Sequence, residues 1–137
     1  MSGHPSRGNS LMRAYLLFIA VGLMPIALSY GVNPAAVLPK VLDIRVDGAD
    51  QTQIFRALMF LYLGCSVFWG TAAFKPAWQR TAVIWGVFFM FSLATGRIIS
   101  LIVDGPASRL LDFYLAAEIF GGVLGLIVLA YARKSAA

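Results

Sequence analysis

Histidine, cysteine and charged residues are scarce in this sequence of 137 residues. The single histidine, His4, lies in a polar N-terminal segment. Its position excludes a histidine-ligated haem within the apolar runs and argues against a histidine or cysteine metal site. The single cysteine, Cys65, excludes an intramolecular disulfide. The sequence also lacks a glycine-rich phosphate loop, a nucleophile elbow and a di-iron carboxylate cluster, so we expect no metal and no cofactor.

The shortage of charge points to the membrane. Charged residues make up 12% of the chain, about half of the ~25% typical of soluble domains. Hydrophobic residues make up 60%, and the mean hydropathy is +0.81. So few charges could not cover a water-facing surface, and the lipid bilayer is the expected solvent. The net charge is +5, but the basic residues stand singly or in pairs between apolar runs, which argues against nucleic-acid binding.

Four apolar runs are long enough to cross a bilayer as helices. They are roughly 12–31, 54–74, 81–103 and 110–132, each close to the ~20 residues needed to span the hydrocarbon. Short turns after the second and third runs require antiparallel neighbours. The sequence therefore predicts an all-α membrane protein, an up-down bundle of four transmembrane helices. We expect a single domain over residues 11–134 with a long outer loop at 32–53, preceded by a disordered tail at 1–10.

Lysine and arginine near the ends of the runs predict the orientation. The N-terminal tail, the second loop and the C-terminal tail hold more of them than the opposite side does. Because cytoplasmic segments carry the excess of basic residues, both termini should face the cytoplasm. The first run has a second interpretation as a secretory signal peptide, with a break at Pro25 and a small-x-small pattern at Ala27-Leu28-Ser29.

The long outer loop contains a further apolar stretch at 35–42, after Asn33-Pro34 has ended the first helix. This stretch is apolar enough to lie on the membrane interface as a short helix or to fold back over the bundle. A partly ordered connection outside the membrane is an equally open interpretation.

Three ionisable residues inside the runs are candidates for function, because a charge in hydrocarbon needs a partner or a water-filled cavity. They are Arg56, Arg97 and Glu118. Arg97 and Glu118 belong to helices joined by a tight turn and lie ~9 and ~12 Å from its two ends, so their depths predict a salt bridge. Arg56 has no acid at equal depth, and must snorkel outward, pair with Asp50 or Asp104, or hold an anionic ligand.

These residues admit two interpretations. One is a structural ion pair beside a snorkelling arginine, and the other is an outward-facing pocket with surplus positive charge. Helical spacing adds further polar residues to such a pocket. They are Tyr62, Ser100, Asp104 and Tyr114. A lining of this kind suits an amphipathic ligand, such as a lipid or a quinone.

Small residues recur every fourth position in the last run, at Ala117, Gly121 and Gly125. Such a row lets another helix approach closely, either within the bundle or from a second subunit. Packing is the default interpretation of this row.

Several motifs resemble one family of small bacterial membrane proteins. They include Tyr30-Gly31-Val32-Asn33-Pro34, Arg56-Ala57-Leu58-Met59 and Gly96-Arg97. Together they are similar to the family catalogued as domain of unknown function 4345, and the likeness spans nearly the whole chain. The resemblance implies a four-helix protein of the bacterial inner membrane, loosely like the DoxX-like proteins in size and layout. It implies no activity, but it places Arg56 and Arg97 within recurring motifs.

Three functional hypotheses follow. The first is a non-enzymatic membrane protein that binds an amphipathic lipid or quinone. The second is an accessory subunit that docks on a larger membrane complex or on a second copy through its glycine row and apolar faces. The third is a small proton-coupled carrier with Glu118 as the titrating group, although Arg97 would hold that carboxylate ionised. Nothing in the sequence demands catalysis.

Overall fold

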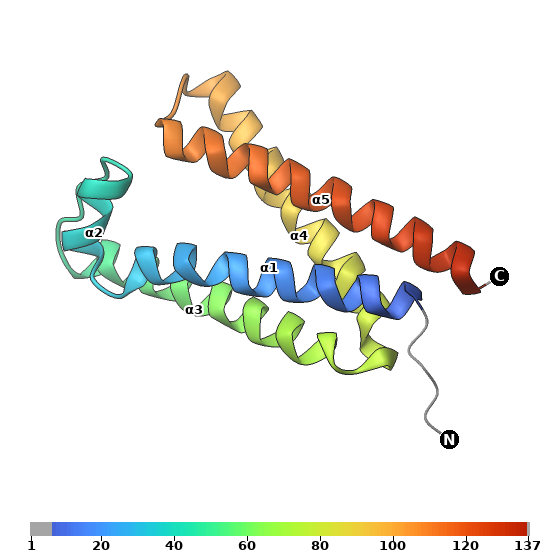
Figure 1. The fold of residues 1–137 in the computed structure, drawn as a ribbon. Coiled ribbons are helices and arrows are strands. Elements are labelled where there is room, and N and C mark those ends of the chain that lie inside the picture. The colour runs from blue at the N-terminus through green and yellow to red at the C-terminus, as the bar shows by residue number, and fades with distance from the viewer. Residues whose placement is uncertain (1–6, 137) are drawn as a thin grey trace.

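The structure, a computed structural model, describes residues 7–136 and is all-α over that range. Four helices are long and apolar enough to cross a membrane, which confirms the four predicted spans. They are α1 (Arg7–Gly31), α3 (Ala49–Ala73), α4 (Pro76–Val103) and α5 (Arg109–Ala136), and a short helix, α2 (Pro34–Val41), follows α1 (Figure 1). The chain is a small multi-pass membrane protein.

The helices extend beyond the predicted apolar runs. α1 begins at Arg7, so residues 7–10 are helical and do not belong to the tail predicted at 1–10; residues 1–6 lie outside the described range. α3 begins at Ala49, where the predicted span began at 54, and α4 begins at Pro76, where it began at 81. Hydropathy locates the part of a helix inside the hydrocarbon, whereas the helix continues through polar residues at the interface. Proline at the first helical position suits the start of α4.

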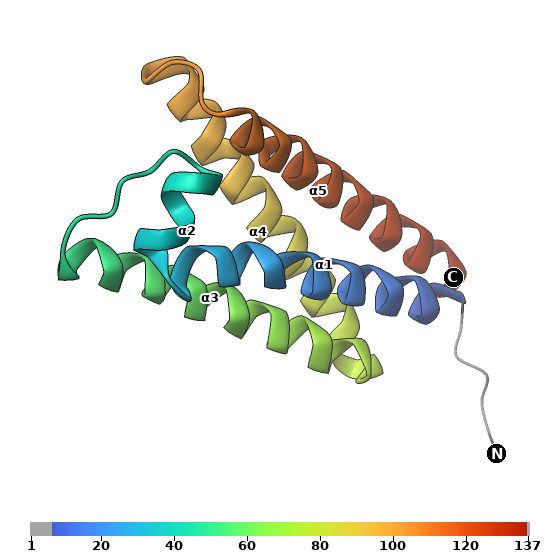
Figure 2. The ribbon, with the colours of Figure 1, turned by 60° about the vertical axis from the view of Figure 1, so that its left-hand side comes forward.

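Successive long helices alternate in direction, so the four form an up-down bundle (Figures 1 and 2). α1 packs closely on α3, α4 packs on α5, and α1 also contacts α4 and α5. The start of α1, the turn between α3 and α4, and the end of α5 lie at one end of the molecule. The ribbons of the two helix pairs diverge toward the other end, where α2 and the turn between α4 and α5 lie.

The start of α1 and the end of α5 meet closely. A side chain at Gly8 would lie 3.1 Å from the Cα of Ala132, so the two backbones touch here. α1 is the central helix, and Tyr15, Leu16 and Ile19 lie in its buried face. A chain cleaved after Ser29, as the signal-peptide interpretation requires, would lose the helix against which α3, α4 and α5 pack.

Glycines of α5 make room for α1. The hydroxyl of Tyr15 donates a hydrogen bond of 3.1 Å to the carbonyl of Gly121. A side chain at Gly125 would lie 2.7 Å from that hydroxyl and would also meet Val87 of α4. Gly121 and Gly125 of the predicted small-residue row therefore pack inside the chain, where Tyr15 and Val87 already occupy the space beside Gly125, whereas Ala117 is exposed.

The apolar stretch of the outer loop folds back over the bundle. Asn33 caps α2 by accepting a hydrogen bond of 3.3 Å from the backbone N–H of Ala36. Leu38, Leu42 and Val46 are buried, and α2 contacts both α1 and α3. The sequence left open a short helix or a partly ordered connection here, and the structure has the short helix.

Candidate functional site

The predicted ion pair between Arg97 of α4 and Glu118 of α5 is present. The Nε of Arg97 donates to both carboxylate oxygens, at 2.9 and 2.8 Å. Glu118 is buried, with 8% of its surface exposed, and Arg97 is half-buried. The two residues meet because the short turn at 104–108 brings α4 and α5 side by side, with Arg97 and Glu118 at a similar depth. Gly105 makes this turn with a φ of +97°, which glycine adopts readily.

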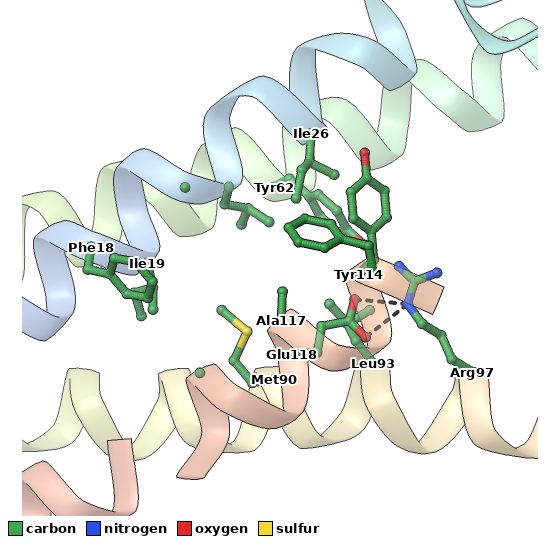
Figure 3. A pocket seen from close by; sticks show the side chains of 14 residues that line it. Phe18, Ile19, Ile26, Tyr62, Met90, Leu93, Arg97, Tyr114, Ala117 and Glu118 are labelled. Carbon is green, nitrogen blue, oxygen red and sulfur yellow. Dashed lines mark hydrogen bonds and ion pairs between the residues drawn. The ribbon is translucent and has the colours of Figure 1, made fainter. Parts of the chain in front are cut away.

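The arginine keeps hydrogen-bond donors that Glu118 does not use. A guanidinium has five N–H donors, and only the one on Nε faces the carboxylate. The two terminal nitrogens point away from Glu118 (Figure 3). The guanidinium carbon lies 5.5 Å from the ring centroid of Tyr114, and the Tyr30 side chain also interacts with Arg97. The pair is thus one side of a larger cluster that combines charge with aromatic rings.

Tyr30 is the member of this cluster that the sequence analysis did not assign to the site. It is buried near the end of α1 and packs against Tyr62 of α3, with ring centroids 5.9 Å apart. Its position in the sequence could have indicated this. The first and third spans of an up-down bundle end on the same side of the membrane, and Tyr30 and Arg97 lie near those two ends. Tyr62, which was predicted, continues the contact to Phe89 at 5.7 Å.

A cavity of about 170 Å³ lies beside the ion pair, between α1, α4 and α5 (Figure 3). Arg97, Glu118, Tyr62 and Tyr114 give it its polar groups. The other walls are apolar or small and include Phe18, Gly22, Leu23, Ile26, Met90, Leu93, Phe113 and Ala117. Phe18 is 54% exposed and Phe113 is 65% exposed. The cavity therefore reaches the face of the protein that contacts lipid.

Arg56 does not join this cavity. It is exposed on α3 and lines a separate open depression with Val46, Gly48 and Asp50. Within residues 7–136 it forms no ion pair, so neither predicted partner, Asp50 nor Asp104, neutralises it. The physical reason is helical geometry, because six residues along a helix turn a side chain about 120° away from the starting direction. Arg56 and Tyr62 consequently lie on different faces, and the predicted surplus of positive charge beside Glu118 does not arise.

Ser100 and Asp104 lie next to the cavity but outside it. The hydroxyl of Ser100 donates a hydrogen bond of 2.7 Å to the Asp104 carboxylate, and both residues are exposed. Ser100 lines a smaller depression of about 80 Å³, together with Arg97 and Asp112. Arg97 therefore borders both spaces, Ser100 lines the second one, and Asp104 lines neither. Among the described residues no three histidine, cysteine or acidic side chains gather closely enough to hold a metal ion.

The model of the family described as Domain of unknown function (DUF4345) matches residues 11–129. The chain belongs to this family. The predicted resemblance is thereby confirmed. The DUF4345 match covers every residue of the cluster around Arg97, which consists of Arg97, Glu118, Tyr30, Tyr62 and Tyr114. No curated protein and no solved structure matches the chain. The geometry of this DUF4345 member is therefore the basis for proposing its function.

Proposed function

We propose that this protein binds the head group of a neutral, lipid-soluble molecule, such as a quinone or an ester lipid, in the cavity between α1, α4 and α5. The observation that carries the proposal is the arrangement of Arg97. Its Nε holds Glu118, while its terminal nitrogens point away from that carboxylate beside an apolar cavity. Hydrogen-bond donors in a dry environment gain most from an acceptor on a ligand.

The charge of the site favours a neutral ligand. One arginine and one glutamate neutralise each other, and the other intramembrane arginine, Arg56, lies in a different depression. An anionic head group would bring a second negative charge beside Glu118, at a cost that rises as the local dielectric falls. A carbonyl oxygen accepts from the guanidinium and the tyrosine hydroxyls without that cost.

The size of the cavity limits what enters it. An apolar cavity of ~150 Å³ holds one benzene molecule, so about 170 Å³ suits a single ring or one ester group. A hydrocarbon tail would leave between Phe18 of α1 and Phe113 of α5, both of which are largely exposed. The molecule that fits therefore has a small acceptor-bearing head and a tail that stays in the bilayer.

The same proposal includes an orientation in a bacterial inner membrane. The six basic residues at the ends of α1 and α5 and around the turn between α3 and α4 favour the cytoplasm for that side and for both termini. The cluster around Arg97 then lies in the outer half of the membrane.

One observation weighs against each of the two other hypotheses from the sequence. Tyr15 and Val87 occupy the space beside Gly125 that a partner helix would need. The Nε of Arg97 holds both oxygens of Glu118, which opposes proton exchange by a carrier.

The test is native mass spectrometry of the protein extracted gently from its own membrane. Gly22→Leu fills the cavity and leaves the ion pair in place, because Gly22 lines the cavity and a side chain there meets nothing within 4 Å. Gly64→Leu is the matched control on the exposed side of α3, where a side chain also meets nothing within 4 Å. We expect a small-molecule adduct on the wild type and on Gly64→Leu, and its loss from Gly22→Leu. An adduct equally present on all three proteins would rule out this cavity.

A further inference from the structure

The two ends of the bundle differ completely in their acidic residues. All six carboxylate side chains lie in the half that contains α2 and the turn between α4 and α5; they are Asp43, Asp47, Asp50, Asp104, Asp112 and Glu118. At the other end, which we call the basic end, every charged side chain of residues 7–136 is positive. These side chains are Arg7, Arg13, Lys75, Arg80, Arg133 and Lys134. No carboxylate side chain of the chain is therefore near enough to neutralise them.

The fold concentrates these charges although they are distant in sequence. The close contact of Gly8 with Ala132 brings together the start of α1, which carries Arg7, and the end of α5, which carries Arg133. All six basic side chains are exposed. The charges come from α1, α4, α5 and the turn before α4, which lie at the same end of the bundle (Figures 1 and 2).

Aromatic rings hold two of the cations at the edge of the apolar surface. The Arg13 guanidinium carbon lies 4.4 Å from the ring centroid of Phe74, and the Lys75 ammonium lies 4.3 Å from the ring of Trp78. Phe74 and Trp78 are themselves exposed. Such contacts position a cation without neutralising it, and tryptophan is typical of the headgroup level of a membrane.

We propose that the basic end binds anionic phospholipids, with their phosphates between Arg13, Lys75 and Arg80 beside Trp78. Phosphates are the anions that lie at this depth in any bilayer, directly beside side chains that face lipid. Each lysine or arginine near an anionic membrane surface contributes about 1 kcal/mol, or roughly fivefold in affinity. This proposal is independent of the cavity ligand, because it uses the opposite end of the bundle.

Trp78 provides a local reporter. The chain has three tryptophans, so Trp69→Phe and Trp85→Phe leave only Trp78. This protein is reconstituted in vesicles with equal fractions of brominated phosphatidylglycerol or brominated phosphatidylcholine, whose bromine atoms quench tryptophan on contact. We expect brominated phosphatidylglycerol to bind beside Trp78 roughly fivefold or more preferentially, and high salt to reduce the preference.

The variant Arg13→Gln/Arg80→Gln tests the residues while keeping Lys75 over the indole. It should lower the preference for phosphatidylglycerol severalfold. The matched control Lys40→Gln/Arg45→Gln removes two cations from the opposite end and should leave the preference unchanged. Circular dichroism checks that each variant keeps its helices. Equal quenching by the two lipids, or a preference that falls equally in both double variants, would overturn the proposal.

Discussion

The Nε of Arg97 donates to both carboxylate oxygens of Glu118, at 2.9 and 2.8 Å, and the terminal nitrogens of the same guanidinium point away from that carboxylate. The relationship explains how a carboxylate with 8% of its surface exposed can lie within a membrane-spanning helix. Arg97 also lines the cavity, so the same residue that neutralises Glu118 is the one we propose to bind the ligand.

Removing one member of the pair should destabilise the bundle, because the other charge then stays buried without a partner. We expect Arg97→Gln and Glu118→Gln each to lower the free energy of unfolding by about 3 kcal/mol. The double variant should recover much of the loss, since it leaves no isolated charge. Unfolding in mixed micelles, followed by circular dichroism, measures all four proteins. Single variants as stable as the wild type would show that the pair contributes nothing to folding.

The contact of α1 with α5 should be sensitive to small changes at Gly125. Gly125→Ala places a methyl group against Val87 and 2.7 Å from the Tyr15 hydroxyl, and overpacking of this kind costs about 1–3 kcal/mol. Tyr15→Phe removes one interhelical hydrogen bond and should cost about 0.6 kcal/mol. Gly64→Ala is the control, because a methyl group there meets nothing within 4 Å. If Gly125→Ala and Gly64→Ala have the same free energy of unfolding, α1 and α5 do not pack closely at Gly125.

The proposed orientation predicts which ends react with a membrane-impermeant thiol reagent. In a Cys65→Ser background, a cysteine at Ser135 should be protected in intact cells, because it lies on the cytoplasmic side. A cysteine at Asp47 should be labelled from outside. Both positions should react once the membrane is opened. Labelling of Ser135→Cys in intact cells would reverse the orientation.

The spans and the ion pair were predictable because each rests on a short-range rule. Hydropathy over about 20 residues identifies a crossing helix, and a tight turn brings equal depths of two helices together, as at Arg97 and Glu118. The same rules identified Tyr62 and Tyr114, which lie in the cavity.

The remainder depends on rotation and packing, which hydropathy does not give. Depth and helical spacing predict Arg56 in the same pocket as Arg97 and Tyr62, but Arg56 lines a separate depression. Tyr30 enters the site because α1 is the central helix of the bundle. Hydropathy gives the length of each helix but does not say which helices are neighbours. The burial of Leu38 likewise depends on how the loop returns to α1 and α3.

The most direct test of the central claim compares a neutral and an anionic molecule with tails of similar length. Decyl-substituted benzoquinone and decanoate are each titrated against the purified wild type, Gly22→Leu and Arg56→Gln by native mass spectrometry. We predict that the quinone forms a one-to-one complex with the wild type and with Arg56→Gln, that Gly22→Leu loses it, and that decanoate binds none of them. Quinone binding that is indifferent to Gly22→Leu, or a preference for decanoate, would contradict the account.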